Sequence, residues 1–175
     1  MPLHWHAWQI VAQRHKLLFP KDRFYALAGV PSEDTLKMLA EEQGRSIDYI
    51  AVALEKESLF VPLIIQAKPI RAVVQIALDN FGKIPMAVAS GGQQQIICDL
   101  LEHLKIKSIF DAVVTCEMVK MQKPAPDIFL EAARRIGVEP RFCRAYEDSD
   151  LGLQAIRAAG MDAVDVRNIG GRICD

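Results

Sequence analysis

The sequence predicts an α/β fold, in which a Rossmann-like parallel sheet forms a three-layer core and a smaller helical segment accompanies it. Residues 1–66 carry apolar side chains at helical spacing throughout, whereas from residue 67 short apolar runs alternate with amphipathic segments. Strand, helix, strand and helix in succession imply right-handed crossovers and parallel strands. We therefore expect two domains, a helical one over 1–66 and an α/β core over 67–175.

The first part of the chain is predicted to form helices only. Apolar residues at helical spacing predict a helix over 3–18. A second helix is expected over 31–44, where Ser32 is the predicted N-cap, acidic residues follow in the first turn, and Gly44 ends the helix. The same apolar spacing continues through 46–64.

The second part is predicted to alternate between strands and helices. Each short apolar run suits a strand that is buried on both faces, and the helix that ends at Gly137 has prolines near its first turn. The expected strands are 84–90, 110–116, 142–147 and 161–166, and the expected helices are 91–105, 124–137 and 150–160.

Composition excludes several functional classes. The net charge is −1, from 21 basic and 22 acidic residues among 175, so charge does not direct the chain toward nucleic acid or an anionic membrane. No apolar run approaches the ~20 residues that span a bilayer, and the first residues lack the pattern of a signal peptide. Cys98, Cys116, Cys143 and Cys174 show no CxxC spacing and are expected to be reduced thiols. We therefore expect a cytoplasmic protein with no nucleic-acid or membrane partner.

Ser90 and Gly91 follow the first predicted strand directly. A hydroxyl followed by glycines at a helix start can hold a phosphate oxygen through the side chain and free backbone N–H groups. The alternative is that Ser90 only caps the following helix.

Lys123 follows the second predicted strand and precedes Pro124. The residue before a proline avoids the helical region, so Lys123 is expected in an extended segment that places its ammonium beyond the strand end. The alternative is a solvated surface lysine.

An acidic cluster follows the third predicted strand. Glu147, Asp148 and Asp150 would repel one another unless a positive charge lies among them. Carboxylates at a strand end suit Mg²⁺, which keeps several waters and takes few protein ligands. The alternative is that Asp148 or Ser149 caps the following helix, and both interpretations can hold for different members of the cluster.

These three signals converge on one place. The carboxyl ends of parallel strands share one edge of a sheet, where ligands bind in open α/β folds. A phosphate-binding hydroxyl, a cation and a metal site at that edge are the groups that phosphoryl transfer requires.

The sequence resembles the haloacid dehalogenase superfamily of phosphatases. "VASGG", "KPAPDIF" and "YEDSDLG" are similar to three of its ordered motifs and contain Ser90, Lys123, Glu147 and Asp148. The most similar branch holds β-phosphoglucomutase and phosphatases of the fructose-1-phosphate type, with a small helical cap that corresponds to residues 1–66.

The resemblance implies a Mg²⁺-dependent phosphatase of small sugar phosphates that works through an aspartyl-phosphate. Ser90, Gly91 and Lys123 would hold the phosphoryl oxygens, with Ser90 and Lys123 as catalytic groups. His4 and Lys56 would contact substrate from the cap, and Asp148 with Glu147 would hold Mg²⁺. The alternatives are a phosphomutase and a non-catalytic remnant that binds phosphate or a partner.

Two departures from the family pattern affect the predicted activity. The nucleophile lies in a D-x-D-G motif on a central first strand, and neither is present in these residues; Asp148-Ser149-Asp150 occupies the place of another motif. We therefore expect a truncated or inactive form, with a gap in the sheet between the strands that end at Ser90 and Glu147. Ser32 stands where phosphomutases of this branch carry a phosphate-binding arginine, which favours the phosphatase.

Overall fold

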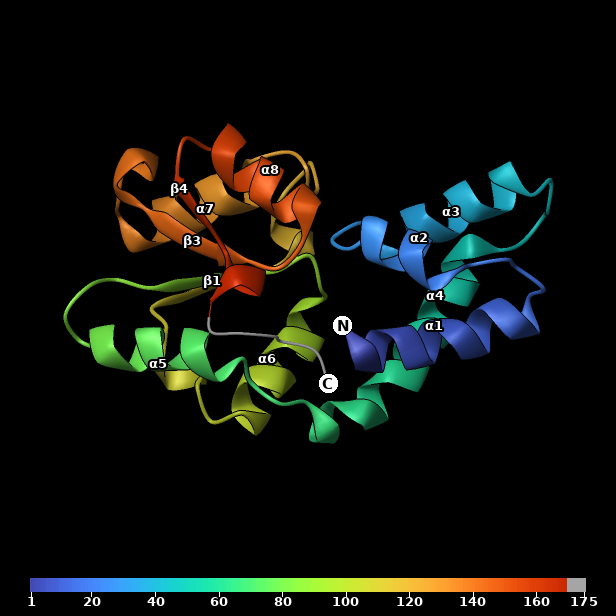
Figure 1. Ribbon diagram of the computed structural model, residues 1–175, viewed down its shortest axis with the longest axis horizontal. Helices are drawn as coiled ribbons and strands as arrows, with labels where there is room; N and C mark the ends of the chain where they lie inside the picture. The colour runs from blue at the N-terminus through green and yellow to red at the C-terminus, as the bar shows by residue number, and fades with distance from the viewer. Residues whose placement is uncertain (170–175) are drawn as a thin grey trace. The chain divides into compact units, whose positions relative to one another are not determined.

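The computed structural model describes residues 1–169, and Cys174 lies outside them. The chain divides into two compact units, of which the first is Met1–Ala67 and the second begins at Lys68. Figure 1 shows helices alone in the first unit and strands with helices in the second.

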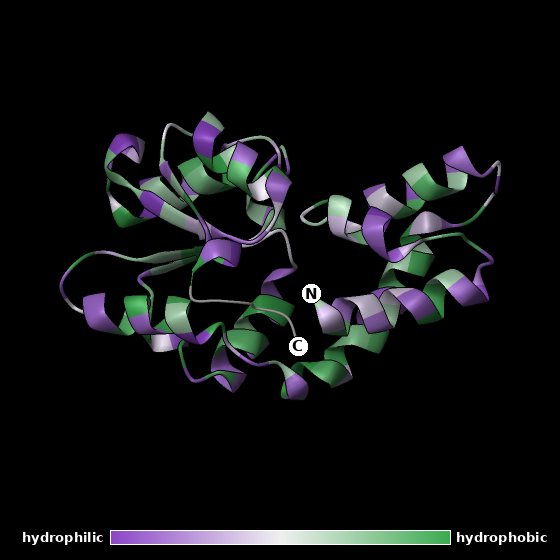
Figure 2. Cartoon of the chain, viewed as in Figure 1, coloured by the Kyte–Doolittle hydropathy of each residue, from purple (hydrophilic) through white to green (hydrophobic). Residues whose placement is uncertain are grey.

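The first unit is built from four α-helices and a 3₁₀ segment. These are α1 (Pro2–Arg14), α2 (Lys21–Ala26), α3 (Ser32–Glu42), α4 (Tyr49–Phe60) and η1 (Val61–Gln66). Helix α4 packs against both α1 and α3, and Figure 2 shows that it is largely hydrophobic. Aromatic and branched aliphatic side chains fill the core, which includes Trp8, Val11, Phe19, Phe24, Leu36, Leu39 and Val52.

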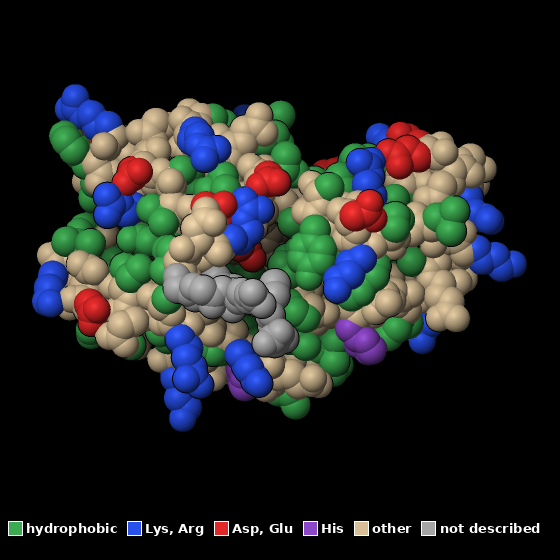
Figure 3. Space-filling view, viewed as in Figure 1, with side chains coloured by type: hydrophobic (Ala, Val, Ile, Leu, Met, Phe, Trp, Pro, Cys, Tyr) green, Lys and Arg blue, Asp and Glu red, His purple; other side chains and the backbone are tan. Residues whose placement is uncertain are grey.

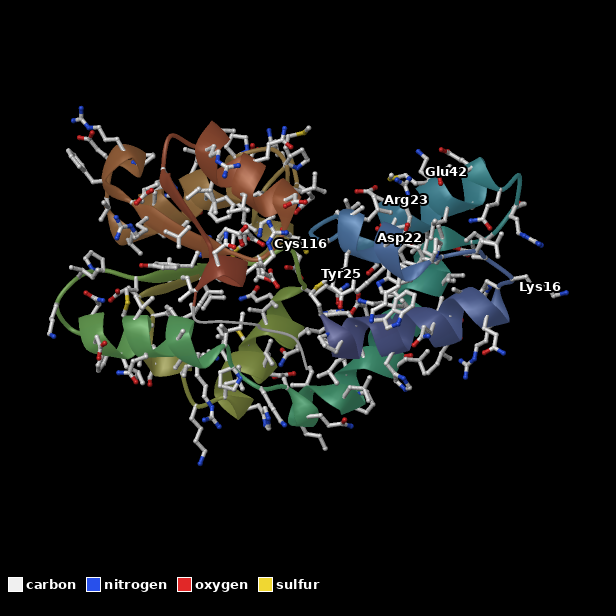
Figure 4. The ribbon with its side chains drawn as sticks, viewed as in Figure 1. Lys16, Asp22, Arg23, Tyr25, Glu42 and Cys116 are labelled. Carbon is white, nitrogen blue, oxygen red and sulfur yellow. The ribbon has the colours of Figure 1, made fainter. Side chains whose placement is uncertain are left out.

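Polar side chains at the helix ends of this unit differ from the sequence prediction. The predicted N-cap role of Ser32 is wrong, because Pro31 occupies the N-cap position and Ser32 is the first helical residue. The Ser32 hydroxyl instead donates to Glu57 on α4 at 2.9 Å. Helix α2 is joined to α3 by Arg23 and Glu42, whose side chains meet at 2.6 Å (Figure 4).

The second unit is a three-layer α/β structure, as predicted. Helices α5 and α6 lie on one side of the strands, and α7 and α8 lie on the other (Figure 1). The α-helices are α5 (Arg71–Asn80), α6 (Gln94–His103), α7 (Asp127–Ile136) and α8 (Asp150–Ala158), the strands are β1 (Ala87–Ala89), β2 (Ala112–Val114), β3 (Arg144–Glu147) and β4 (Asp162–Asp165), and the 3₁₀ turns are η2 (Lys107–Ile109), η3 (Cys116–Met118), η4 (Pro140–Phe142) and η5 (Val166–Asn168).

The strands form two parallel pairs. In the first pair Val88 of β1 lies beside Val113 of β2, and in the second Tyr146 of β3 lies beside Val164 of β4. Within residues 1–169 no ladder joins one pair to the other. The family resemblance implies a further strand between β1, which ends just before Ser90, and β3, which ends at Glu147. Helix α7 packs on both β1 and β2 and contacts α8, so one apolar core extends behind both pairs.

Acidic and basic side chains are interspersed on the face shown in Figure 3. Among the described helices, no single one is long and apolar enough to cross a membrane, although Tyr49–Gln66 and Arg71–Asn80 together have the necessary length and composition.

Candidate active site

A buried ion pair lies at the carboxyl ends of the strands. The ammonium of Lys123 donates to Glu147 Oε2 at 2.6 Å, and the two side chains are only 7% and 10% exposed. The Lys123 ammonium also lies 5.0 Å from the centre of the Phe129 ring on α7. Burial alone would raise the pKa of Glu147, but Lys123 and the donors of Ser149 outweigh it, and the pKa is lowered.

The second oxygen of Glu147 faces the start of α8. Glu147 Oε1 accepts from the Ser149 hydroxyl at 2.7 Å and from the Ser149 N–H at 3.0 Å. Ser149 in turn accepts from Gly152 N–H and caps the helix, so the capping interpretation is confirmed for Ser149. Asp150 pairs with Arg167 at 2.7 Å. Lys123 and Arg167 therefore supply the positive charge that the acidic cluster requires.

Gly152 leaves room for the buried carboxylate. A Cβ placed on Gly152 would overlap the side chain of Glu147, which Lys123 and Ser149 hold in place. We expect Gly152→Ala to displace Glu147 and destabilise the second unit by about 1–3 kcal/mol, the usual range for overpacking. Chemical denaturation followed by circular dichroism measures this change. The exposed Gln154→Ala on the same helix is the control, and equal stability of the two variants would contradict the expected displacement.

Ser90 lies just beyond β1, in the turn before α6. Its N–H donates to Val114 O at 2.9 Å, which extends the β1–β2 ladder, and its Oγ accepts from Gly92 N–H at 3.2 Å. The N-cap of α6 is Gln93, so the alternative that Ser90 caps this helix is wrong. Among residues 1–169, no acceptor is found for the Ser90 hydroxyl proton, which is therefore available to a ligand oxygen.

Glu117 occupies the N-terminus of α6, a feature that the sequence reading missed. Both its carboxylate oxygens lie 3.0 Å from Gln94 N, and the buried Thr115 hydroxyl donates to it at 2.8 Å. The N–H of Gln94 is thus satisfied by the protein itself. The two-residue spacing between Thr115 and Glu117 is the sequence signal for their contact, whereas no sequence signal indicates the contact between Glu117 and Gln94.

The acidic residues suit at most a hydrated metal ion. Within the described part of the chain, no three His, Cys, Asp or Glu side chains group as metal ligands. Asp148 is exposed, and both oxygens of Glu147 are engaged. Local desolvation and the neighbouring Glu147 charge raise the pKa of Asp148, as expected where a cation would relieve repulsion. Asp148 therefore fits Mg²⁺ as a single direct ligand, because Mg²⁺ retains most of its waters.

His4 and Lys56 meet inside the first unit. The Lys56 ammonium lies 3.1 Å from His4 Nδ1, and Lys56 is 3% exposed. The His4 ring stacks on Phe60 with centroids 3.8 Å apart. Burial, the Lys56 charge and the chain's amino terminus lower the pKa of His4 to about 2, so its ring is neutral and accepts from Lys56. Burial also lowers the pKa of Lys56, against the effect of Glu57.

The neutral His4 makes the stability of the first unit depend on pH. Its pKa is lower in the folded chain than the ordinary 6.5, so the unfolded chain binds more protons at acidic pH. The stabilisation is complete above pH 6.5 and is lost as pH falls below it, by at most about 1.4 kcal/mol per pH unit. We expect His4→Phe, which retains the stack, to flatten this acid dependence. Fluorescence of Trp5 and Trp8 measures it, and the exposed His6→Phe is the control.

The arrangement in the second unit defines a class of protein. Parallel strands present a serine, a buried lysine and carboxylates at their carboxyl edge, which is where ligands bind in open α/β folds. The sequence model of the haloacid dehalogenase-like hydrolase family matches residues 2–166, and the chain belongs to this family. The expected class, a phosphoric monoester hydrolase, is confirmed at the level of the family.

Curated relatives extend over nearly the whole chain. Fructose-1-phosphate phosphatase YqaB of Escherichia coli is 39% identical over 166 residues, which cover 95% of this chain and 88% of that protein. β-Phosphoglucomutase of Bacillus subtilis is 32% identical over 177 aligned residues, with 93% of this chain and 75% of that protein covered.

A solved structure has the same fold. β-Phosphoglucomutase from Clostridium difficile superimposes with a TM-score of 0.82 at 25% identity, over 93% of this chain and 76% of that one. The expected resemblance to the branch that contains β-phosphoglucomutase and fructose-1-phosphate phosphatase is therefore confirmed.

Proposed function

We propose that this chain forms the body of a Mg²⁺-dependent phosphatase of small sugar phosphates. The observation that carries the proposal is the buried Lys123–Glu147 pair at the carboxyl ends of the strands, beside the exposed Asp148. The similarity to the fructose-1-phosphate phosphatase of Escherichia coli supports the substrate class. A cytoplasmic location belongs to the same proposal.

Ser90, Gly91 and Lys123 are the proposed phosphate-binding groups. The Ser90 hydroxyl and the Gly91 N–H donate to phosphoryl oxygens, since the Ser90 proton has no other acceptor within residues 1–169. Lys123 has three ammonium protons, of which the bond to Glu147 uses one. Glu147 fixes the ammonium, so the remaining protons are oriented before substrate binds, which avoids reorganisation during the reaction.

Asp148 and Glu147 are the proposed magnesium residues. Asp148 would be the direct ligand, and Glu147 would act through water while it holds Lys123. When bound, Mg²⁺ would supply charge stabilisation at the phosphoryl oxygens.

The proposed reaction needs a nucleophile that these 175 residues do not provide in the family's D-x-D-G form. An aspartate carboxylate would attack phosphorus, the sugar alkoxide would leave with a proton, and water would then cleave the aspartyl-phosphate to release inorganic phosphate. His4 and Lys56 on the helical cap would contact the substrate and help exclude water.

A phosphomutase is the second candidate, and one observation favours it. The chain is similar to β-phosphoglucomutase in sequence and fold. Against it, Ser32 replaces the arginine of phosphomutases, and the Ser32 hydroxyl is bound to the acidic Glu57. A mutase must hold a second phosphate, which a carboxylate at this place would repel. A non-catalytic phosphate-binding remnant is the third candidate, supported by the interruption of the sheet.

Product analysis separates the two enzymatic candidates. A form of the protein extended upstream to a D-x-D-G strand is incubated with Mg²⁺ and either fructose-1-phosphate or β-glucose-1-phosphate plus a bisphosphate activator. We expect release of inorganic phosphate and little glucose-6-phosphate, with loss of turnover when EDTA removes Mg²⁺. Efficient isomerisation would instead establish the mutase, and no turnover of any phosphate ester would support the remnant.

A further inference from the structure

The loop that joins β1 to α6 is hydrogen-bonded at alternate residues to the chain that follows β2. The three bonds are Ser90 N–H to Val114 O at 2.9 Å, Cys116 N–H to Gly92 O at 3.4 Å, and Gln94 N–H to the Glu117 carboxylate at 3.0 Å. The first two join backbone atoms, whereas the third depends on a side chain. Glu117 therefore supplies the one of these three attachments that a substitution can remove.

Glu117 is itself fixed by Thr115. The Thr115 residue is fully buried, and its hydroxyl donates to Glu117 Oε2 at 2.8 Å. Desolvation alone would raise the pKa of Glu117, but the donors from Gln94 and Thr115 outweigh it, and the pKa is lowered. The carboxylate is therefore charged at neutral pH, and the N-terminal end of the α6 dipole favours that charge.

The chain that contains Glu117 also carries Lys123. Gln122 Nε2 donates to Cys116 O at 3.0 Å, which closes residues 116–122 into a loop. Lys123 follows directly, and its ammonium is held by Glu147. Glu117 thus joins the loop that contains Ser90 to the loop that precedes Lys123.

The groups left over in the first loop are donors. Within the part of the chain that the structure describes, no acceptor is found for the N–H groups of Gly91 and Gln93, which alternate with the three bonded positions. The Ser90 hydroxyl proton is likewise available. These donors lie on a short segment whose far end, at Gln94, is held by Glu117.

We propose that Glu117 is a positioning residue for the phosphoryl group: its carboxylate fixes the start of α6, so that the Ser90 hydroxyl and the Gly91 N–H are oriented, and set at a constant separation from Lys123, before substrate binds. This role rests on the proposed function, in which Ser90, Gly91 and Lys123 bind the phosphoryl oxygens. Glu117 acts through these residues and does not contact the reacting atoms.

Two substitutions at Glu117 separate its geometry from its charge. Glu117→Ala leaves the Gln94 N–H without its acceptor, so the ligand must order the loop, and we expect phosphate affinity to fall about 10-fold. Glu117→Gln keeps an acceptor oxygen for Gln94 and should stay within about 3-fold of the unaltered chain. Glu117 is exposed, so neither substitution disturbs the core.

Nuclear magnetic resonance of the 175-residue chain, titrated with inorganic phosphate, measures these affinities from the amide signals of Ser90 and Gly91. Circular dichroism shows that each variant is folded under the same conditions. Glu102→Ala is the matched control, because Glu102 is an exposed glutamate near the other end of α6 that pairs with Lys107. It should leave the phosphate Kd unchanged.

Thr115 gives a readout that a merely structural role would not produce. Thr115→Val removes the hydroxyl that holds Glu117 and should weaken phosphate binding by itself. Combined with Glu117→Ala it should weaken binding no further, because Thr115 acts through Glu117 and the two effects are then not additive. Additive losses in the folded double variant would contradict the coupling.

Kinetics of the upstream-extended protein provide a second readout. Glu117→Ala should lower kcat/KM by the same factor for fructose-1-phosphate and for p-nitrophenyl phosphate, because the phosphoryl group is what the two substrates share. A loss confined to fructose-1-phosphate would mean that Glu117 acts on the sugar, and would overturn the inference.

The binding results also separate this role from the proposed function. An unchanged Kd in Glu117→Ala, or an equal loss in Glu117→Gln, would overturn the positioning role while the phosphate site stands. A lower Kd in Glu117→Ala would overturn it too, since Glu117 would then compete with phosphate for the loop. Absence of any shift at Ser90 and Gly91 in the unaltered chain would overturn the proposed phosphate site, and the positioning role with it.

Discussion

Replacing Lys123 by methionine is expected to destabilise the second unit by about 3–5 kcal/mol, the range for removing one partner of a buried ion pair. Methionine has a similar length to lysine but carries no charge. The substitution removes the ammonium that lies 2.6 Å from Glu147 Oε2, while the Glu147 side chain stays nearly buried, at 10% exposure. The donors of Ser149 still bind one oxygen, but the charge on Glu147 loses the cation that lowered its pKa.

Chemical denaturation followed by far-ultraviolet circular dichroism measures this loss. Trp5 and Trp8 both lie in the first unit, so their fluorescence shows separately whether that unit is affected. The exposed Lys120→Met is the control and should change the free energy of unfolding by less than about 0.5 kcal/mol. Adding Glu147→Gln to Lys123→Met should recover part of the loss, because the unpaired charge is then removed. A Lys123→Met variant as stable as the control would mean that the ion pair does not stabilise the fold.

Strand order in the sequence predicts the parallel sheet and the edge that we propose as the functional one. Parallel strands place their carboxyl ends together, so Ser90, Lys123 and Glu147 could be assigned to one edge without coordinates. The direct contact of Lys123 with Glu147 could not be derived from sequence. A lysine 24 residues before an acid can meet it directly or across a metal ion, and only the side-chain positions decide between these arrangements.

Element ends were less predictable, for physical reasons that the residues show. The first strand was expected over 84–90 but extends only over Ala87–Ala89, because a ladder forms only where β1 and β2 lie in register. Ser32 followed the usual N-cap preference, yet Glu57 on a helix distant in sequence takes its hydroxyl. Helix α5 (Arg71–Asn80) was not among the predicted elements, and in the structure none of its residues is fully buried.

The 175-residue chain itself is expected to hydrolyse phosphate esters at least ~10⁴-fold more slowly than a form extended upstream to a D-x-D-G strand, by analogy with the loss when a catalytic nucleophile is removed. Phosphoryl transfer needs a nucleophile in line with the leaving oxygen. Ser90 and Lys123 can bind phosphate, and Asp148 can bind a metal ion, but none of these three is the proposed nucleophile. Glu147 is held on both oxygens and is not free to attack.

Both forms are assayed with p-nitrophenyl phosphate and Mg²⁺, after purification that removes contaminating phosphatases. Asp148→Asn and Asp150→Asn in the short chain serve as controls, since Asp148-Ser149-Asp150 is the one D-x-D sequence in these residues. The extended form should also be more stable, because a strand inserted between β1 and β3 would pair the backbone groups that face the interruption. Comparable turnover by the two forms would place the nucleophile within these 175 residues and contradict the expected loss.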